Sequence, residues 1–353
     1  MKAVTLELRV TKPATIRDVA QRAGVSLATV SRALNGSSLV REVTRDRVVA
    51  VAEELDFAPS LSARRLSLGK TQTITVIVSF LTRPQAAERL RGVDAALADS
   101  EFDLNIYNVE TVEKRNQYFQ TLPLRQRTDG LLVMSLPPPA SEVERLMRSD
   151  VPIVFIDARE NTGSLQRILG DDVAGGMLAT QHLLDLGHRR IGFVGDAFEN
   201  PFGFTSSRDR FEGYARALAL AGIEAAAGDL AFGAHGRYEA RDLAARMLAR
   251  SDRPTAIFAA SDTQALGVLA AAQDLGLHVP DDLSVIGYDD IEACDFVGLT
   301  TVRQHLFESG RQGADLLMAQ IAERTASPQV VVLQPSIIQR RTTAPRKEGT
   351  NQD

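Results

Sequence analysis

The 353-residue sequence contains one cysteine, Cys294. A single cysteine excludes a disulfide framework within the chain and a zinc or iron–sulfur site built from several cysteines. No segment approaches the roughly 18 consecutive apolar residues of a membrane-spanning helix. The first ten residues, MKAVTLELRV, have no continuous apolar core of a signal peptide, because Glu7 and Arg9 interrupt them. We therefore expect a cytoplasmic protein with no membrane partner.

The sequence motifs of common enzyme and metal sites are also missing. No two glycines are spaced i, i+2, so the dinucleotide-binding pattern GxGxxG is absent, and HExxH, CxxC and GxSxG do not occur. Gly69-Lys70 is not a P-loop, since Arg64 stands where the first glycine is needed. The histidines are scattered without metal-ligand spacing. We predict no enzyme activity, no cofactor and no metal site.

Charge is distributed unevenly along the chain. Residues 1–70 contain 12 Lys and Arg against 7 Asp and Glu, whereas the remainder contains 28 against 38, which together give the net charge of −5. A basic head on an acidic body indicates an anionic partner for the head alone. The alternative is that the basic residues are clustered in the head by chance.

The pattern over residues 13–60 predicts a helix-turn-helix domain. Its first helix begins at Thr15, with Asp18 as the capping-box partner. Gly24 permits a sharp turn, and Ser26 caps the second helix. Asn35-Gly36 ends that helix, because both residues tolerate the left-handed conformation. A third apolar-periodic stretch over 48–55 covers the other two helices.

In such a domain the second helix enters the major groove with its N-terminal side chains toward the base edges. Arg32 faces outward and can donate two hydrogen bonds to a guanine, which is worth about 1–3 kcal/mol of discrimination. The other DNA contacts predicted in this domain are Thr15, Ser26, Leu27, Ala28, Thr29, Ser31 and Asn35. Small three-helix units also serve as protein-docking modules, but the basic charge and Arg32 favour DNA.

Residues 61–70 are expected to form a hinge helix and a linker after the break at 57–60. Leu66 is an apolar residue on a segment too short to bury it. It either packs on the following domain or acts as a minor-groove wedge that kinks the duplex.

The head motif resembles that of the LacI/GalR (lactose-repressor) family of bacterial transcriptional regulators. The matching residues are Thr15-Ile16-Arg17-Asp18-Val19-Ala20, Ala23-Gly24-Val25-Ser26 and Thr29-Val30-Ser31-Arg32-Ala33-Leu34-Asn35. The resemblance extends from about residue 15 to residue 343. It implies that Ala63 and Leu66 lie on a hinge helix, and that Leu66 inserts into the minor groove at the operator centre.

From residue 71 onward, apolar runs typical of strands alternate with alanine-rich stretches typical of helices. The runs are 73–80, 103–109, 130–135, 151–157, 190–195, 254–260, 283–288 and 330–338, and the helical stretches include 85–99, 172–186, 207–221, 236–250 and 262–275. This alternation predicts an α/β fold of doubly wound parallel sheets. A body of about 270 residues favours two lobes with a ligand cleft between them.

The resemblance implies a two-lobed, periplasmic-binding-protein-like core over 71–343. One lobe is expected near 71–170 plus 302–330, and the other near 171–301 plus 331–343. Residues 344–353 contain Pro345 and Gly349 but no leucine, so we expect a disordered tail. The resemblance implies tetramers only where this tail is a leucine-heptad helix, so a homodimer is predicted.

Polar residues at strand ends are the candidates for the cleft. Asp157, Ser261 and Asp289 follow three of the apolar runs, and Arg210 begins a helix. A carboxylate accepts hydrogen bonds from two neighbouring hydroxyls and an arginine donates a planar fork, so an Asp–Arg pair suits a polyol. For each aspartate, the alternative is a loop or helix cap.

The resemblance implies that Arg210 and Asp289 are the main effector-binding residues. It places Ser261 where many sugar-responsive members have asparagine, and Gln304 at a crossover that reaches the ligand. Phe80 or Phe232 is expected to stack on a sugar or base face.

Together these observations predict an effector-responsive, sequence-specific DNA-binding regulator that binds a pseudo-palindromic operator as a homodimer. The Arg–Asp pair without a clear aromatic sandwich favours a repressor of carbohydrate-metabolism genes that a sugar releases. A regulator corepressed by a purine or another small molecule is the alternative, and a sugar-binding protein without DNA binding is a second.

Overall fold

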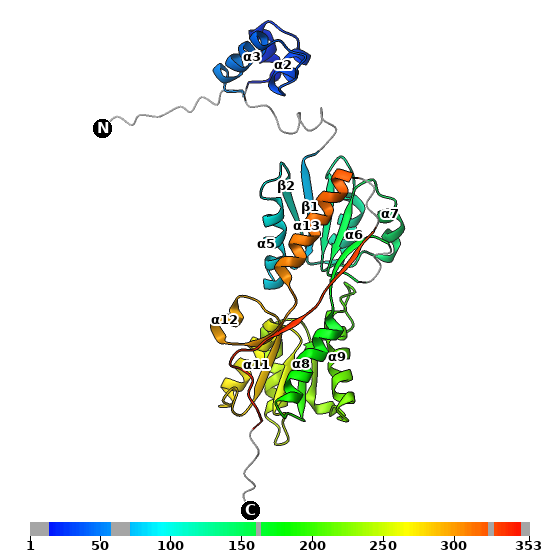
Figure 1. The fold of residues 1–353 in the computed structure, drawn as a ribbon, viewed down its shortest axis with the longest axis vertical. Coiled ribbons are helices and arrows are strands. Elements are labelled where there is room, and N and C mark those ends of the chain that lie inside the picture. Colours follow the sequence, from blue (N-terminus) through cyan, green and yellow to red (C-terminus); the bar gives the residue numbers. More distant parts are fainter. Residues whose placement is uncertain (1–13, 58–70, 160–163, 324–327, 347–353) are drawn as a thin grey trace, which may run out of the picture. The chain divides into compact units, whose positions relative to one another are not determined.

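The computed structural model describes residues 14–57, 71–159, 164–323 and 328–346 (Figure 1). The chain divides into two compact units, Met1–Thr71 and Gln72–Asp353. We call the first the head and the second the core. No helix in the described ranges has the length and apolarity needed to cross a membrane.

The head is a three-helix unit, which confirms the predicted helix-turn-helix. Its helices are α1 (Ile16–Ala23), α2 (Leu27–Leu34) and α3 (Glu42–Glu54). The side chains of Val19, Val30 and Val48 are fully buried where the three helices meet. Burial of this shared apolar face holds together helices that are too short to be stable alone.

Local capping sets the ends of the first two helices as the sequence predicts. The Asp18 carboxylate accepts hydrogen bonds from the backbone N–H and the hydroxyl of Thr15, both at 2.7 Å. Gly24 has a φ of 63°, in the left-handed region where glycine carries no steric penalty. Ser26 Oγ accepts from the Thr29 N–H at 3.1 Å. At the end of α2 only one of the two residues Asn35 and Gly36 is left-handed. Gly36 has a φ of 68°, whereas Asn35 has a φ of −90°.

The first lobe of the core is a six-stranded parallel sheet of order β11-β5-β4-β3-β1-β2. Its strands are β1 (Thr73–Ser79), β2 (Asp103–Val109), β3 (Gly130–Met134), β4 (Ile153–Ile156), β5 (Gln166–Gly170) and β11 (Val330–Leu333). Its helices are α5 (Pro84–Leu97), α6 (Val112–Thr121), α7 (Val143–Met147) and α13 (Leu306–Glu323), with a 3-10 turn at Ala140–Glu142.

Helices α5 and α13 pack side by side in this lobe (Figure 1). The contact is close because Gly92 faces the backbone of Phe307 and Gly310 faces the backbone of Arg89. A Cβ at either glycine would overlap those backbone atoms. This packing fixes the part of α5 from which Arg89 extends.

The second lobe is a six-stranded sheet of order β12-β10-β9-β8-β6-β7, parallel except for the β10–β12 pair. Its strands are β6 (Ile191–Asp196), β7 (Leu230–Gly233), β8 (Ala256–Ala259), β9 (Ser284–Asp289), β10 (Thr300–Arg303) and β12 (Ser336–Ile338). Its helices are α8 (Asp172–Asp185), α9 (Ser206–Leu220), α10 (Arg237–Leu248), α11 (Asp262–Asp274) and α12 (Ala293–Val297), with a 3-10 turn at Ala227–Asp229.

The two sheets confirm the predicted α/β architecture, and they differ from the expected strands in two respects. Strands β5, β7 and β10 were not predicted, because each is four or five residues long and contains at least one exposed or half-exposed position. The apolar run 330–338 is two strands in different sheets, separated at Pro335, which has no N–H to donate to a ladder. Residues 330–333 therefore belong wholly to the first lobe.

The carboxyl-terminal residues 344–346, which the sequence assigns to a disordered tail, lie against the second lobe. The Ala344 N–H donates to Ser284 Oγ at 3.1 Å, and its carbonyl lies 3.1 Å from His188 Nε2. The Arg346 N–H donates to the Leu186 carbonyl at 2.8 Å. These three residues differ from the expectation because backbone hydrogen bonds, which composition does not reveal, hold them in place.

Candidate functional site

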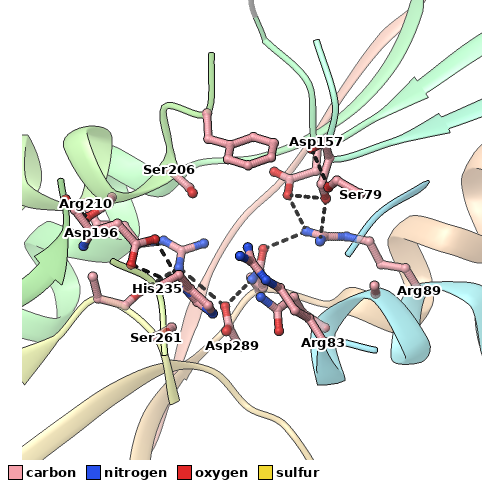
Figure 2. Close-up of a pocket in the computed structure, with 17 residues that line it drawn as sticks. Ser79, Arg83, Arg89, Asp157, Asp196, Ser206, Arg210, His235, Ser261 and Asp289 are labelled. Carbon is pink, nitrogen blue, oxygen red and sulfur yellow. Dashed lines mark hydrogen bonds and ion pairs between the residues drawn. The ribbon is translucent and has the colours of Figure 1, made fainter. Parts of the chain in front are cut away.

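A cavity of about 640 Å³, which includes its opening to solvent, lies between the two lobes of the core (Figure 2). It is lined by residues that follow the carboxyl ends of strands from both sheets, where ligands bind in doubly wound folds. Ser79, Ser135 and Asp157 come from the first lobe, and Asp196, Ser261 and Asp289 from the second. A hollow in which a few polar side chains converge is typical of a small-molecule site.

On the first-lobe side, Arg89 of α5 forms a fixed fork. Its side chain is 3% exposed. Nη2 lies 2.8 Å from Asp157 Oδ2, Nη1 donates to Ser135 Oγ at 3.0 Å, and Nε donates to Ser309 Oγ at 3.3 Å. An arginine held by this many partners has little freedom left to lose on ligand binding.

On the second-lobe side, Arg210 of α9 occupies a similar network. Nε donates to Asp172 Oδ1 at 2.8 Å, and Nη1 donates to the Ala260 carbonyl at 2.6 Å. Nη1 also lies 3.4 Å from Asp289 Oδ1. The guanidinium stacks over the ring of Tyr288, 3.7 Å from its centroid, which adds a cation–π contact.

Gln304 joins these two networks. It lies in the crossover between β10 and α13, and its side chain is buried. Its Oε1 accepts from Arg89 Nη2 at 3.0 Å, and its Nε2 donates to Asp289 Oδ1. One amide therefore contacts an arginine of the first lobe and a carboxylate of the second.

Burial shifts the titration of the acidic residues. It raises the pKa of Asp289 to about 7, although the positive charge of Arg210 opposes this. Burial likewise raises the pKa of Asp172, and Arg210 again opposes the shift. In the described part of the chain, the polar contacts of Asp157 use Oδ2 and those of Asp289 use Oδ1. The other oxygen of each carboxylate is left as an acceptor for a ligand.

Several residues that line the cavity were not singled out from the sequence, Arg89 and Ser135 among them, and three more are Arg83, Asp196 and His235. His235 Nδ1 lies 3.1 Å from Asp196 Oδ2, and Gln264 Nε2 donates to Asp196 Oδ1 at 2.8 Å. Among the described residues, the buried His235 Nε2 has no hydrogen-bond partner. Arg83 lines the same wall, and its guanidinium lies 4.0 Å from the centroid of the Phe80 ring. Of the three, only Asp196 had a sequence signal, since it ends an apolar run.

The structure brings together five of the seven predicted effector-site residues in the cavity. These are Asp157, Arg210, Ser261, Asp289 and Gln304. Ser261 is also the N-cap of α11, where its Oγ accepts from the Gln264 N–H at 3.2 Å.

The two predicted aromatic residues lie elsewhere. Phe80 lines an adjoining groove rather than the cavity, and Arg83 covers one face of its ring. Phe232 lines neither, because its ring packs against Phe193 and Phe198 in an aromatic cluster of the second lobe. The sequence could not separate these positions, since a phenylalanine after a strand looks the same in a core and in a site.

The predicted DNA-contacting residues lie on the head. Arg32, Leu27 and Ala28 on α2 are exposed, as are Ser26 and Asn35 at its two ends and Thr15 at the start of α1, whereas Thr29 and Ser31 are half-buried. Ser26 additionally caps the helix by accepting from the Thr29 N–H, and the two hydroxyls lie 2.9 Å apart. Ala63 and Leu66 lie outside the described residues.

Comparison with known proteins matches both units. Residues 15–60 match the model of bacterial regulatory proteins of the lacI family, and residues 180–343 match a periplasmic binding protein-like domain. The ribose operon repressor of Escherichia coli K12 is 36% identical over 336 residues, which cover 93% of this chain and 99% of the relative. The chain belongs to the lacI family of bacterial regulatory proteins.

Other lacI-family proteins are also similar to this chain over nearly its whole length. The HTH-type transcriptional repressor PurR of Photobacterium profundum is 33% identical, over 93% of this chain and 98% of the relative. A crystal structure of the lac repressor dimer bound to operator and the anti-inducer ONPF has a TM-score of 0.81 and 28% identity, over 94% of this chain and 100% of that chain. These relatives are transcriptional repressors rather than enzymes. The chain is thus a DNA-binding transcriptional regulator with an effector-binding core, as the sequence predicts.

Proposed function

We propose that this lacI-family protein is a homodimeric repressor that binds a pseudo-palindromic operator and is released by a sugar. The observation that carries the sugar assignment is the cavity wall, in which carboxylates from both lobes are held by arginines. A fixed carboxylate accepts hydrogen bonds from neighbouring hydroxyls of a polyol, and a fixed guanidinium donates to its oxygens. The similarity to a ribose operon repressor supports the same ligand class.

Gln304 couples ligand binding to the relative arrangement of the two lobes in this proposal. Its amide contacts Arg89 and Asp289 in the structure described here. A sugar whose hydroxyls contact Asp157 and Asp289 bridges the same two lobes and competes for these partners. A ligand shifts a conformational equilibrium only by its difference in affinity for the two states, and new contacts across the cleft provide that difference.

Helix α5 connects this change to the dimer in our proposal. Arg89 extends from its buried face into the cavity, while Ala87, Arg91, Asp94 and Ala95 on its other face are exposed. We infer that this exposed face and its neighbours form the dimer contact. A change in lobe arrangement would then alter the spacing of the two heads, and with it the affinity for operator DNA.

The head reads DNA in this proposal through Arg32, Leu27 and Ala28 of α2. Two heads are needed because one helix-turn-helix gives too few contacts for tight, specific binding. The hinge segment 61–70, with Ala63 and Leu66, adds a minor-groove contact at the operator centre. Binding to the bacterial chromosome implies a cytoplasmic protein.

A purine corepressor is the second candidate, because PurR proteins are among the relatives. A planar base is best held between apolar or aromatic faces. Phe232 packs within the second lobe and Arg83 covers one face of Phe80, so neither aromatic residue that the sequence predicts forms a stacking surface in the cavity. Apart from Phe204 and two alanines, the residues that line the cavity are charged or polar. This composition favours the sugar.

A thermal-shift screen of sugars and purines against the full-length protein tests the proposal, followed by operator binding with each compound that raises the Tm. We expect sugars to raise the Tm and weaken operator binding, and sedimentation equilibrium to give a homodimer. A purine that tightens operator binding, with no sugar effect, would establish the second candidate instead.

A further inference from the structure

A loop of the second lobe inserts an aromatic side chain into the hydrophobic core of the first lobe. The loop is residues 197–205, between β6 and α9. Phe202 on this loop is 8% exposed, and the other buried members of its hydrophobic cluster all come from the first lobe. They include Ile77 of β1, Phe119 of α6 and Val133 of β3. The lobes are therefore joined by side-chain packing in addition to the chain segments that cross between them.

Three aromatic rings form the contact between this loop and the first lobe. The rings of Phe202 and Phe204 are stacked, with centroids 5.2 Å apart and an interplanar angle of 11°. Phe80, which follows β1, meets both of them edge-on at centroid distances of 5.5 and 6.3 Å. Gly203 has a φ of 76°, in the left-handed region, which lets the backbone turn between the two stacked rings. The three rings make one packed unit that spans the two lobes.

Hydrogen bonds hold the loop in this position from both sides. From the first lobe, Arg115 Nη1 donates to the carbonyls of Pro201 at 3.2 Å and of Phe202 at 3.3 Å. Within the loop, Asn200 Oδ1 accepts from the N–H of Phe202 at 3.2 Å and of Phe204 at 2.9 Å. Asn200 Nδ2 donates to the Phe204 carbonyl at 2.9 Å. The loop is thus an ordered element rather than a passive connection.

We propose that loop 197–205 is a clasp, which holds the two lobes together in the ligand-free protein and is released when the cavity opens. Phe204 of the loop and Ser206 and Ser207 at the start of α9 line the cavity, so the clasp is part of the cavity wall. Separation of the lobes on this side withdraws Phe202 from the first-lobe core, because the ring belongs to one lobe and its neighbours to the other. Apolar surface returns to water in that step, and the clasp therefore favours the closed arrangement.

The clasp acts on regulation by setting the resting equilibrium between the two lobe arrangements. A ligand shifts such an equilibrium only by its difference in affinity for the two states. The starting position, which the clasp determines, decides how large a change that difference produces. The same holds for a sugar and for a purine, so this inference does not depend on the identity of the effector.

Phe198 provides a matched control on the same loop. Its ring contacts those of Phe211 and Phe232, which both belong to the second lobe, and it is 39% exposed. Truncation of Phe198 removes a phenylalanine from the loop without removing a ring that packs in the first-lobe core. Phe202→Ala and Phe198→Ala therefore differ in the contact between lobes.

Double electron–electron resonance on the full-length protein tests the inference. Spin labels at Gln117→Cys in α6 and Ala219→Cys in α9, both exposed positions, report the distance between the lobes. The native Cys294 is 1% exposed and is not expected to react. Labelled chains are diluted tenfold with unlabelled protein, so that distances within one chain dominate. Without ligand we expect a single population, an added longer one in Phe202→Ala with an open-to-closed ratio raised at least tenfold, and no added population in Phe198→Ala.

Arg115→Met is a second variant, because it removes the hydrogen bonds to the loop without leaving a hole in the core. It should give the longer population to a smaller extent. A distribution that Phe202→Ala leaves unchanged overturns the inference, and so does an equal shift in Phe198→Ala. If Phe202→Ala does not fold, an unchanged distribution in Arg115→Met overturns it instead. Failure of every sugar in the thermal-shift screen refutes the sugar effector and leaves the clasp standing, since no ligand enters this measurement.

Discussion

Replacing Arg210 by leucine should destabilise the protein strongly, because Arg210 is the cation between two buried carboxylates. Its side chain is 7% exposed, and those of Asp172 and Asp289 are 4% and 2% exposed. Arg210→Leu keeps much of the packing volume but leaves both carboxylates without their shared partner. Removing one member of a buried ion pair costs about 3–5 kcal/mol of unfolding free energy.

The stability lost in Arg210→Leu should depend on pH, and the pKa shifts of the two aspartates give the direction of that dependence. Burial raises the pKa of Asp289 to about 7 and also raises that of Asp172, while Arg210 opposes both shifts. Without Arg210 both values rise further above those of the unfolded chain. When a carboxyl group is protonated in the folded protein and ionised in the unfolded chain, the free energy of unfolding falls as the pH rises above the unfolded pKa of that group. The deficit should therefore be smaller at about pH 5 than at about pH 8, by roughly 1 kcal/mol or more.

Urea denaturation of wild type, Arg210→Leu and Arg210→Leu/Asp172→Asn at both pH values measures this effect. We expect Asp172→Asn to restore part of the lost stability, since it removes one uncompensated charge. The control is Arg216→Leu on the same helix, where a 58% exposed arginine pairs with Glu212 and the loss should be below about 1 kcal/mol. A deficit that is the same at both pH values, with no recovery in the double variant, would refute the reasoning.

Four further predictions concern the head, the hinge, the crossover and the carboxyl terminus. Arg32→Ala should weaken operator binding by about 1–3 kcal/mol and relax preference at one base pair per half-site in a binding-site selection assay, because it removes a bidentate base contact. Leu66→Ala should lower affinity for operator more than for scrambled DNA in titrations at fixed salt, because unstacking is selective for a deformable step. Gln304→Leu should reduce the ligand-induced change in operator affinity, measured by fluorescence anisotropy, more than it reduces operator affinity itself. Deleting residues 344–353 should lower the Tm relative to deleting 347–353, because only the longer deletion removes the hydrogen bonds of Ala344 and Arg346.

Each of these predictions has an outcome that contradicts it. Unchanged base preference in Arg32→Ala would remove that side chain from direct readout. An equal fall on both DNAs for Leu66→Ala would indicate a packing role. A full ligand response in Gln304→Leu would exclude the crossover amide from the coupling, and equal Tm values for the two deletions would mean that residues 344–346 add no stability.

The head was predictable because its signals are local. The capping pair Thr15–Asp18, the Ser26 cap and the left-handed Gly24 each act within a few residues, and the structure shows all three. In the core, long buried strands were predictable from their apolar runs. The short strands β5 and β7 were not, because their formation depends on a neighbouring strand that is already in place.

For the site, the sequence by itself determined which polar residues follow strands, and hence that Asp157 and Asp289 are candidates for the cleft. Tertiary structure decided the rest. The chain crosses between the lobes, so Gln304 contacts Arg89, which is 215 residues away in the sequence. Phe80 and Phe232 have the same chemistry and a similar setting in the sequence, but one borders the groove and the other is part of the second-lobe packing. Such differences depend on which distant segments cover a side chain, and contacts between distant segments leave no periodic signal in one sequence.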